Sequence, residues 1–231
     1  MTPTAAPPEV YRWTRRGLRA RVGDSVSARS RRRRIELYRR LMRPRPDEDV
    51  VDVGCGDVGL AVLEPTARIT GVDLVDRPGY ADGPRSFVRA DARRLPFPDG
   101  RFDIGYSNSL IEHIPPGFRR EVAVEIRRVS QRYFVQTPNR WFPVEPHVLL
   151  PLFQLLPLAA RRRLWRFGVS RDPFEDIRLL GPRELRSLFP DGVLVRERLG
   201  PLTKSLVIAG PATRIEPPTR RRGRGRRPGS S

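Results

Sequence analysis

The chain has 231 residues, enough for one domain with a sizeable core that needs neither disulfides nor metals. Cys55 is its only cysteine, which excludes a disulfide framework and a cysteine-rich zinc site and favours a reducing, cytoplasmic location. No apolar run approaches the roughly 18 residues that cross a bilayer, so we expect no membrane-spanning helix and no secretory signal.

The net charge of +19 gathers at the two ends of the chain. Residues 1–49 hold 14 arginines against 6 acids and residues 214–231 hold 7 against 1, so the middle is only mildly basic. We expect residues 1–26 to be a partly disordered extension, residues 27–213 to form the domain, and the Arg/Gly-rich residues 214–231 to be a disordered tail. Either this tail is simply solvated, or its charge contacts RNA or anionic lipid.

Helical and extended patterns alternate through the first part of the domain. Apolar residues at helical spacing beneath an arginine-rich face predict a helix over 27–42, which Pro44 and Pro46 end. This alternation predicts a parallel sheet with helices on both faces, a doubly wound α/β fold. The predicted strands cover 50–53, 68–73, 86–91, 101–108 and 132–137, and a second helix covers 118–130.

The later part of the chain differs in composition. Residues 147–167 are apolar and aromatic, are interrupted by prolines and end in an arginine cluster, which predicts a small helical cap at about 139–180. A short helix over 181–190 and two closing strands, 193–200 and 203–210, follow the cap.

Two of the connections between strands are irregular. Residues 75–85 hold two prolines and two glycines, so the crossover helix between the second and third strands is expected to be shortened or absent. Pro65 limits the helix that follows the first strand to a short one.

The stretch "VVDVGCGDVG", residues 50–59, places glycines directly after the first strand. Glycine allows positive φ and close approach to a ligand, and a strand-to-helix turn aims backbone amides at a negative group. Asp52 lies in that first strand, while Asp73 and Asp91 end the next two. Because parallel strands finish at one sheet edge, the three acids should converge there, with Asp73 spaced from Asp52 as a ribose-binding carboxylate would be.

Four segments in this order, "VVDVGCGDVG", "GVDL", "ADARRLPFPDGRFDIGYSNSLIEHI" and "RYFVQTPN", closely resemble the class I S-adenosylmethionine-dependent methyltransferases. The resemblance covers roughly residues 49–139, and "LPFPDGRFD" leading into "SNSLIEHI" is its most specific part. It implies a Rossmann-like three-layer sandwich with a seven-stranded, mostly parallel sheet and an antiparallel last strand. The glycine loop departs from the family pattern, because Val58 stands where a third glycine is common and Gly59 follows one step later.

The resemblance also implies S-adenosyl-L-methionine as the cofactor and gives roles to individual residues. Asp73 would accept hydrogen bonds from the ribose hydroxyls. Asp91 would bind the adenine amino group, with the Ala92 backbone beside the ring. The residues implied at the methionine end and near the reacting methyl are Asp52, Gly54, Gly56 and Asn108.

Candidate acceptor residues come from two places. His113 follows the fourth strand and is either a catalytic base or a packed or capping histidine. His147 lies with Trp141 and Glu145 where family members insert a substrate cap, and these three are the candidate substrate-binding residues, with His147 a second candidate base.

The sequence therefore predicts methyl transfer to a small, lipid-like or sugar-bearing acceptor, more readily at oxygen than at carbon or nitrogen. The cap, its arginine cluster and the N-terminal helix together resemble an interfacial surface, which suggests peripheral contact with the anionic inner membrane face. One alternative makes the acceptor RNA, and the charged ends favour it. Another is a non-catalytic cofactor-binding or scaffold protein.

Overall fold

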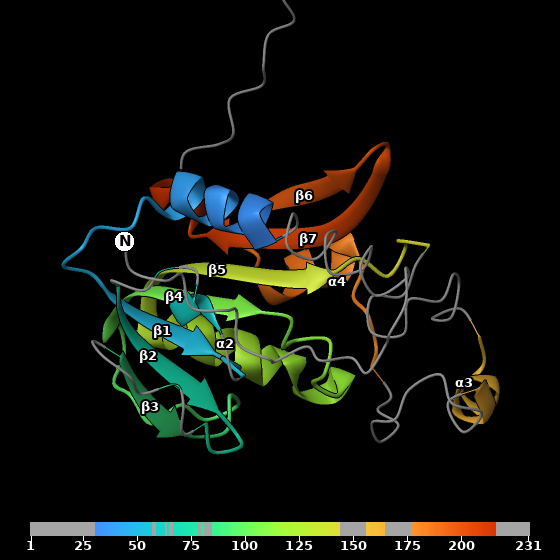
Figure 1. The fold of residues 1–231 in the computed structure, drawn as a ribbon, viewed down its shortest axis with the longest axis horizontal. Helices are drawn as coiled ribbons and strands as arrows, with labels where there is room; N and C mark the ends of the chain where they lie inside the picture. The colour runs from blue at the N-terminus through green and yellow to red at the C-terminus, as the bar shows by residue number, and fades with distance from the viewer. Residues whose placement is uncertain are drawn as a thin grey trace, which may run out of the picture.

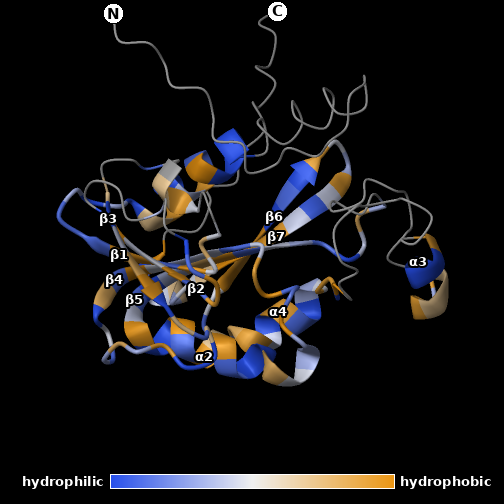
Figure 2. Ribbon diagram, turned by 60° about the horizontal axis from the view of Figure 1, so that its bottom comes forward, coloured by the Kyte–Doolittle hydropathy of each residue, from blue (hydrophilic) through white to orange (hydrophobic). Residues whose placement is uncertain are grey.

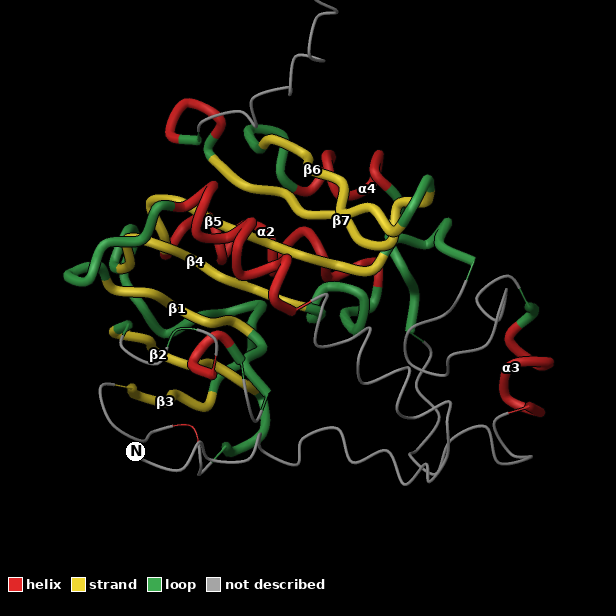
Figure 3. Tube along the Cα trace, turned by 45° about the horizontal axis from the view of Figure 1, so that its top comes forward, coloured by secondary structure: helices red, strands yellow, loops and turns green. Residues whose placement is uncertain are grey.

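The sheet is the frame of the molecule. A computed structural model describes residues 31–56, 59–62, 64, 67–77, 80, 85–143, 156–164 and 177–215. Within these ranges seven strands form one sheet in the order β3-β2-β1-β4-β5-β7-β6 (Figure 1, Figure 3). The strands are β1 (Asp49–Val53), β2 (Arg68–Asp73), β3 (Arg85–Arg89), β4 (Phe102–Asn108), β5 (Ser130–Pro138), β6 (Val193–Leu199) and β7 (Leu202–Gly210).

Strand directions confirm the predicted fold class. β1 to β5 pair in parallel, and β7 runs antiparallel to both β5 and β6. The parallel strands thus end together at one edge, here called the carboxyl edge. β3 ends two residues before Asp91, so this acid lies in the turn beyond the strand and not in it.

Helices cover both faces of the sheet. On one face pack α2 (Arg119–Val129) and α4 (Pro182–Leu188), and on the other a helix over 31–42 and the 3-10 helix η1 (Leu60–Val62) (Figure 1, Figure 2). α2 buries Val122, Ile126 and Val129, which recur at helical spacing. The remaining short helices are η3 (Pro116–Phe118), α3 (Leu158–Leu164) and η6 (Ala212–Arg214).

The helix over 31–42 buries its apolar face in the protein's own core. Ile35, Tyr38, Leu41 and Met42 are all buried, as the helical spacing predicted. The Tyr38 ring meets those of Tyr106 and Phe134 edge-on, with centroids 5.5 and 5.6 Å apart. This apolar face is therefore covered by the sheet and is no part of an interfacial surface.

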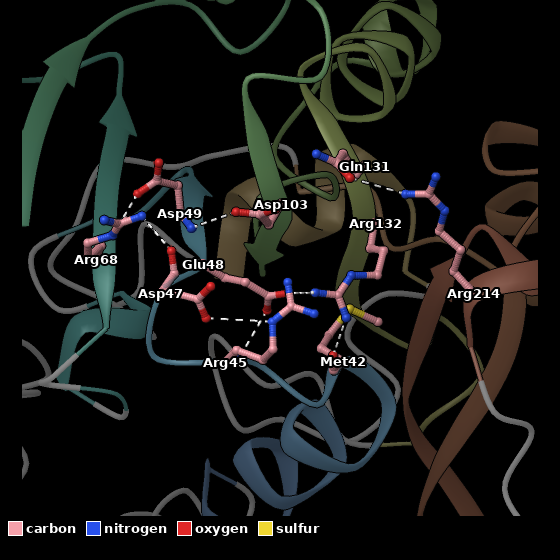
Figure 4. A network of polar contacts seen from close by, with 10 residues as sticks. All are labelled: Met42, Arg45, Asp47, Glu48, Asp49, Arg68, Asp103, Gln131, Arg132 and Arg214. Atoms are coloured by element: carbon pink, nitrogen blue, oxygen red, sulfur yellow. Dashed lines mark hydrogen bonds and ion pairs between the residues drawn. The ribbon is translucent and has the colours of Figure 1, made fainter.

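A polar network ties this helix to the amino edge of the sheet (Figure 4). Glu48 is 4% exposed and accepts hydrogen bonds from the Arg132 guanidinium at 2.6 Å and the Arg45 backbone N–H at 3.0 Å. Arg132 also donates to the carbonyl of Met42, the last helical residue. A buried charge that is paired and hydrogen-bonded in this way fixes the helix relative to β5.

The irregular connections behave as predicted. The helix after β1 is the single turn η1, and the described residues between β2 and β3 contain no α-helix. Tyr80 from that second connection is 1% exposed and fills the core where a crossover helix would pack, with its ring against Gly71 of β2. Of the predicted cap, only residues 139–143, 156–164 and 177–180 are described, and the ends, 1–30 and 216–231, lie outside the described residues.

Candidate cofactor and acceptor site

The glycine loop begins where β1 ends at the carboxyl edge. Gly54 has φ +74°, and its N–H donates to the Val72 carbonyl of β2 at 2.8 Å. A Cβ at Gly54 would lie 2.8 Å from the Leu110 side chain. The backbone conformation and this close approach both require glycine here.

Asp73 at the end of β2 holds the loop from the side. Its Oδ2 accepts from the Gly56 N–H at 3.0 Å, its Oδ1 accepts from the Val75 N–H at 3.0 Å, and Arg77 Nε lies 3.3 Å away. The carboxylate is 14% exposed, and a Cβ at Gly56 would meet open space. An anionic acceptor thus stands beside a free volume over the loop, as a ribose diol requires.

Asp52 supports the same loop from inside the protein. It is 1% exposed, and its Oδ2 accepts from the Leu60 N–H at 2.6 Å and the Tyr80 hydroxyl at 3.0 Å. Burial raises the pKa of Asp52 to about 6, although these hydrogen bonds oppose the shift. A Cβ at Gly59 would overlap this carboxylate, and Gly59 also has positive φ, so the displaced third glycine is a requirement of this loop.

Asp91 lies beyond β3 with its carboxylate turned to solvent. The side chain is 35% exposed and forms a two-pronged pair with Arg93, whose Nη2 donates to Oδ2 at 2.6 Å. These hydrogen bonds from Arg93 hold the pKa of Asp91 below its ordinary value. The Arg93 guanidinium also lies 4.9 Å from the Phe118 ring centre. Ala92 follows Asp91 and packs partly buried against the core.

Asn108 ends β4, next to the glycine loop. Its Oδ1 accepts a hydrogen bond from Arg34 Nη1 at 2.8 Å, which brings the N-terminal helix to the carboxyl edge. Ser109 follows with φ +56°, and its N–H donates to the Gln136 carbonyl of β5 at 3.0 Å. A non-glycine residue held at positive φ by its neighbours is strained, and such strain clusters at functional sites.

The candidate acceptor residues are only partly described. His113 is half-buried in the turn after β4, where its N–H donates to the Leu110 carbonyl at 2.9 Å. Trp141 follows β5 with 66% of its surface exposed, and the Arg140 guanidinium lies 5.3 Å from its ring centre. Glu145 and His147 lie outside the described residues.

Other chemistries have little support in the described part of the chain. Cys55 is buried, and burial raises the pKa of its thiol, which suits a filler of the turn and not a nucleophile. Among the described residues no group of three His, Cys, Asp or Glu side chains could hold a metal ion. No helix in the described ranges has the length and apolar character to cross a membrane.

Three residues of the site were not selected from the sequence. Tyr80 and Arg34 contact Asp52 and Asn108, which lie far from them in the sequence. For Tyr80 the one sequence signal was an aromatic residue in a Gly/Pro-rich connection, and for Arg34 there was none. Leu74, directly after Asp73, is 65% exposed and offers an apolar surface beside the predicted ribose position. A leucine directly after the strand-ending Asp73 was the sequence signal that could have found this residue.

The strand order, the glycine loop and the acids at successive strand ends define a Rossmann-like methyltransferase architecture. Residues 51–132 match the family model described as a methyltransferase domain. Residues 51–132 therefore match a methyltransferase domain, in agreement with the class I S-adenosylmethionine-dependent methyltransferases that the sequence motifs resemble.

Similar proteins agree with this assignment. A segment of 97 residues is 34% identical to the "Probable tocopherol O-methyltransferase, chloroplastic" of Oryza sativa subsp. japonica and covers 36% of this chain, but only 26% of that relative's length. A second relative, an "Uncharacterized methyltransferase" of Mycobacterium marinum, is 41% identical over 54 residues, which are 23% of this chain and 20% of that protein.

Solved structures share the fold at low identity. A protein of Pyrococcus horikoshii OT3 has a TM-score of 0.54 at 21% identity and covers 79% of this chain and 89% of its own. The N-methyltransferase NodS of Bradyrhizobium japonicum WM9, solved with S-adenosyl-L-homocysteine, has a TM-score of 0.51 at 12% identity, with 78% and 85% covered. At these identities the likeness shows the fold alone.

Proposed function

We propose that the chain transfers the methyl group of S-adenosylmethionine to an oxygen atom of a small, lipid-like or sugar-bearing acceptor. One observation carries the cofactor part of this proposal most: the Asp73 carboxylate holds the Gly56 N–H beside an open volume over the glycine loop. The match of residues 51–132 to the methyltransferase model supports the same chemistry.

The residues present fit the groups of the cofactor. S-adenosylmethionine carries a ribose diol, an exocyclic amine and a cationic sulfonium, and each of these favours an acidic or carbonyl partner. The partly exposed Asp73 would hold the ribose hydroxyls and Asp91 the adenine amine. Asn108 at the end of β4 would stand near the methionine end. Asp52 is fully engaged inside the protein, so its part would be to fix the loop.

Methyl transfer depends mainly on how the acceptor is positioned. Methyl transfer from a sulfonium is an in-line displacement, and holding the acceptor oxygen behind the methyl group supplies much of the rate. A hydroxyl acceptor also loses a proton, and His113 at the carboxyl edge is the described candidate to take it. Transfer to oxygen is supported by the rice relative, whose name describes an O-methyltransferase.

Calorimetric titration with S-adenosylmethionine tests the cofactor site. Asp73→Asn should weaken binding about tenfold or more, because the ribose hydroxyls lose a charged acceptor. Asp76→Asn is the matched control, since Asp76 lies nearby with 69% of its side chain exposed and pairs with Arg89. A folded wild-type protein that fails to bind S-adenosylmethionine would contradict the proposal.

Release of S-adenosylhomocysteine tests the transfer itself. The protein is incubated with S-adenosylmethionine and, in separate reactions, with prenols, phenols, glycolipids and structured RNA. Turnover with a hydroxyl compound supports the proposal, and turnover with RNA alone supports the RNA alternative. Cofactor binding without turnover on any acceptor would favour the non-catalytic reading.

We also propose that α3 contacts an anionic membrane surface. Arg161, Arg162 and Arg163 follow one another on this helix, none of whose residues is buried, and Leu164 is 37% exposed. Flotation with phosphatidylglycerol vesicles should therefore be reduced when the three arginines are replaced by glutamine. Unchanged flotation, or binding to structured RNA but not to vesicles, would contradict this contact.

A further inference from the structure

The proposed cofactor site follows the order of the strands along the carboxyl edge. β3, β2, β1 and β4 lie side by side in that order. Asp91 follows β3 and is assigned to the adenine, Asp73 ends β2 and is assigned to the ribose, and the glycine loop follows β1. The methionine end of the cofactor leaves the ribose on the side opposite the adenine, so it should reach the end of β4, where Asn108 lies. This placement rests on the proposed function.

Asn108 lies beside the start of the glycine loop. β1 and β4 pair in parallel with Asp52 opposite Tyr106, and the Ser107 hydroxyl donates to the Val53 carbonyl at 2.9 Å. Asn108, half-buried, is the next residue of β4, so it stands where the chain leaves β1 for the loop. A carboxamide offers both a donor and an acceptor, and its orientation decides which of the two a ligand over the loop meets.

Arg34 of the N-terminal helix sets that orientation. Its Nη1 donates to Asn108 Oδ1 at 2.8 Å. A guanidinium has donors only, so the oxygen of the carboxamide must face it and the Nδ2 group must be turned another way. A hydrogen bond from a charged donor is stronger than one between neutral groups. Arg34 therefore holds Asn108 in one of its two possible orientations.

Two elements hold Arg34 itself. Tyr38 lies one helical turn later on the same face, and its buried ring packs edge-on against those of Tyr106 and Phe134. On the side of β6, Glu197 Oε2 lies 3.6 Å from Arg34 Nε, and the two side chains are only 15% and 12% exposed. Neither of these two atoms forms a hydrogen bond within the described residues, so charge alone joins them. Such an attraction is weakly screened where water has little access.

We propose that Arg34 is a positioning residue for the cofactor. By holding Asn108 Oδ1, it presents the Asn108 Nδ2 group as a donor to the carboxylate at the methionine end of S-adenosylmethionine. Arg34 acts through Asn108 and does not itself touch the cofactor. Without Arg34 the carboxamide is able to turn over, and its oxygen would then repel that carboxylate.

Two ligands that differ only at this end test the role. S-adenosylhomocysteine carries the amino-acid chain on its sulfur, whereas methylthioadenosine carries a methyl group there and keeps the adenine, ribose and thioether. Both are titrated by calorimetry into full-length protein, below the melting temperature of each variant. Arg34→Met keeps a long side chain without a donor. It should weaken binding of S-adenosylhomocysteine about tenfold and of methylthioadenosine less than about twofold. Equal binding of the two ligands by the wild type, or a similar loss for both in the variant, overturns the proposal.

A double-mutant cycle shows whether Arg34 acts through Asn108. Asn108→Ala alone should weaken binding of S-adenosylhomocysteine about tenfold. Adding Arg34→Met to it should then change the affinity by less than about twofold, because the group that Arg34 positions is already gone. A further tenfold loss would mean that Arg34 contacts the cofactor directly, against the proposal. Arg34→Lys still offers a donor to Asn108 Oδ1 and should retain part of the affinity.

Two further variants separate this role from the rest of the site. Arg33→Met is the matched control, because Arg33 is exposed one position earlier on the same helix, and it should leave both affinities unchanged. Asp73→Asn should weaken both ligands alike, since both carry the ribose. Failure of the wild type to bind either ligand would contradict the proposed function. Wild-type binding that Arg34→Met leaves unchanged would contradict the positioning role alone.

Discussion

Two acids of the site, Asp52 and Asp73, lie at the ends of paired neighbouring strands yet do different work. Asp52 is buried and accepts hydrogen bonds from the Leu60 N–H and the Tyr80 hydroxyl. Asp73 is partly exposed and shares its oxygens between backbone amides and Arg77. Burial therefore separates a residue that shapes the glycine loop from one that a ligand can reach.

The raised pKa of Asp52 makes stability depend on pH. Its pKa is about 6 in the folded protein against an ordinary value of 3.8, so between these values the folded state holds a proton that the unfolded chain has lost. This contribution is fully present below pH 3.8 and disappears as the pH rises through 6. Asp52→Asn cannot ionise, so its stability relative to wild type should rise by about 3 kcal/mol from pH 3.5 to pH 7.

Urea unfolding at half-unit pH intervals measures that difference. Glu36→Gln on the exposed face of the N-terminal helix, away from the buried carboxylate, is measured alongside as the control. A flat difference for Asp52→Asn would show that Asp52 does not carry the raised pKa.

Tyr80 acts on the loop through one hydroxyl. Tyr80→Phe keeps the buried ring but removes the donor to Asp52, so we expect a loss of about 1–3 kcal/mol in stability and several-fold weaker binding of S-adenosylmethionine. Tyr133→Phe is matched to it, because Tyr133 donates to Asp191 at 2.9 Å away from the glycine loop. That control should lose stability alone, and equal cofactor affinity in both variants would remove Tyr80 from the support of the site.

At the scale of elements, two glycines with positive φ can show whether the space over the glycine loop binds a ligand. Only one of them, Gly56, lies in the loop. Gly56 and Gly100 both have positive φ, +56° and +62°, and a Cβ at either would meet no protein atom within 4 Å. Gly56→Ala and Gly100→Ala should therefore each cost about 1–2 kcal/mol of stability. Calorimetry should show a loss of S-adenosylmethionine affinity for Gly56→Ala only, and similar affinities would mean that the open volume over the loop is not the cofactor site.

Local elements were predictable because their signals are local. The parallel strands, the helix at 119–129 and the glycine loop follow from periodicity, from glycine and from acids at strand ends. The boundaries were less certain, as the early end of β3 before Asp91 shows. Tyr80 and Arg34 escaped prediction because each meets its partner through tertiary packing, which no sequence period encodes.

On the scale of the whole molecule, the two edges of the sheet have separate roles. The buried network around Glu48 joins the N-terminal helix to β5 at the amino edge, whereas every described candidate residue lies at or beyond the carboxyl edge. Substitutions in the network at the amino edge should thus change stability without changing ligand binding.

Glu48→Ala tests this separation. It leaves Arg132 partly buried without its carboxylate and should cost about 3 kcal/mol or more of stability, while the affinity for S-adenosylmethionine stays unchanged. Asp99→Asn removes the carboxylate of an exposed pair with Arg128 and should cost less than about 1 kcal/mol. Denaturant unfolding and calorimetry measure the two effects, and weakened cofactor binding in Glu48→Ala would show that the edges are coupled.

The contact between Arg34 and Glu197 has a consequence for the order in which parts of the molecule form during synthesis. The glycine loop, Asp73 and Asp91 are all made early in translation, but Glu197 emerges only with the closing hairpin of β6 and β7. The residues of the proposed cofactor site are therefore synthesised before the two strands that complete the sheet. The ion pair between Arg34 and Glu197 can thus form only after the closing hairpin has joined the sheet.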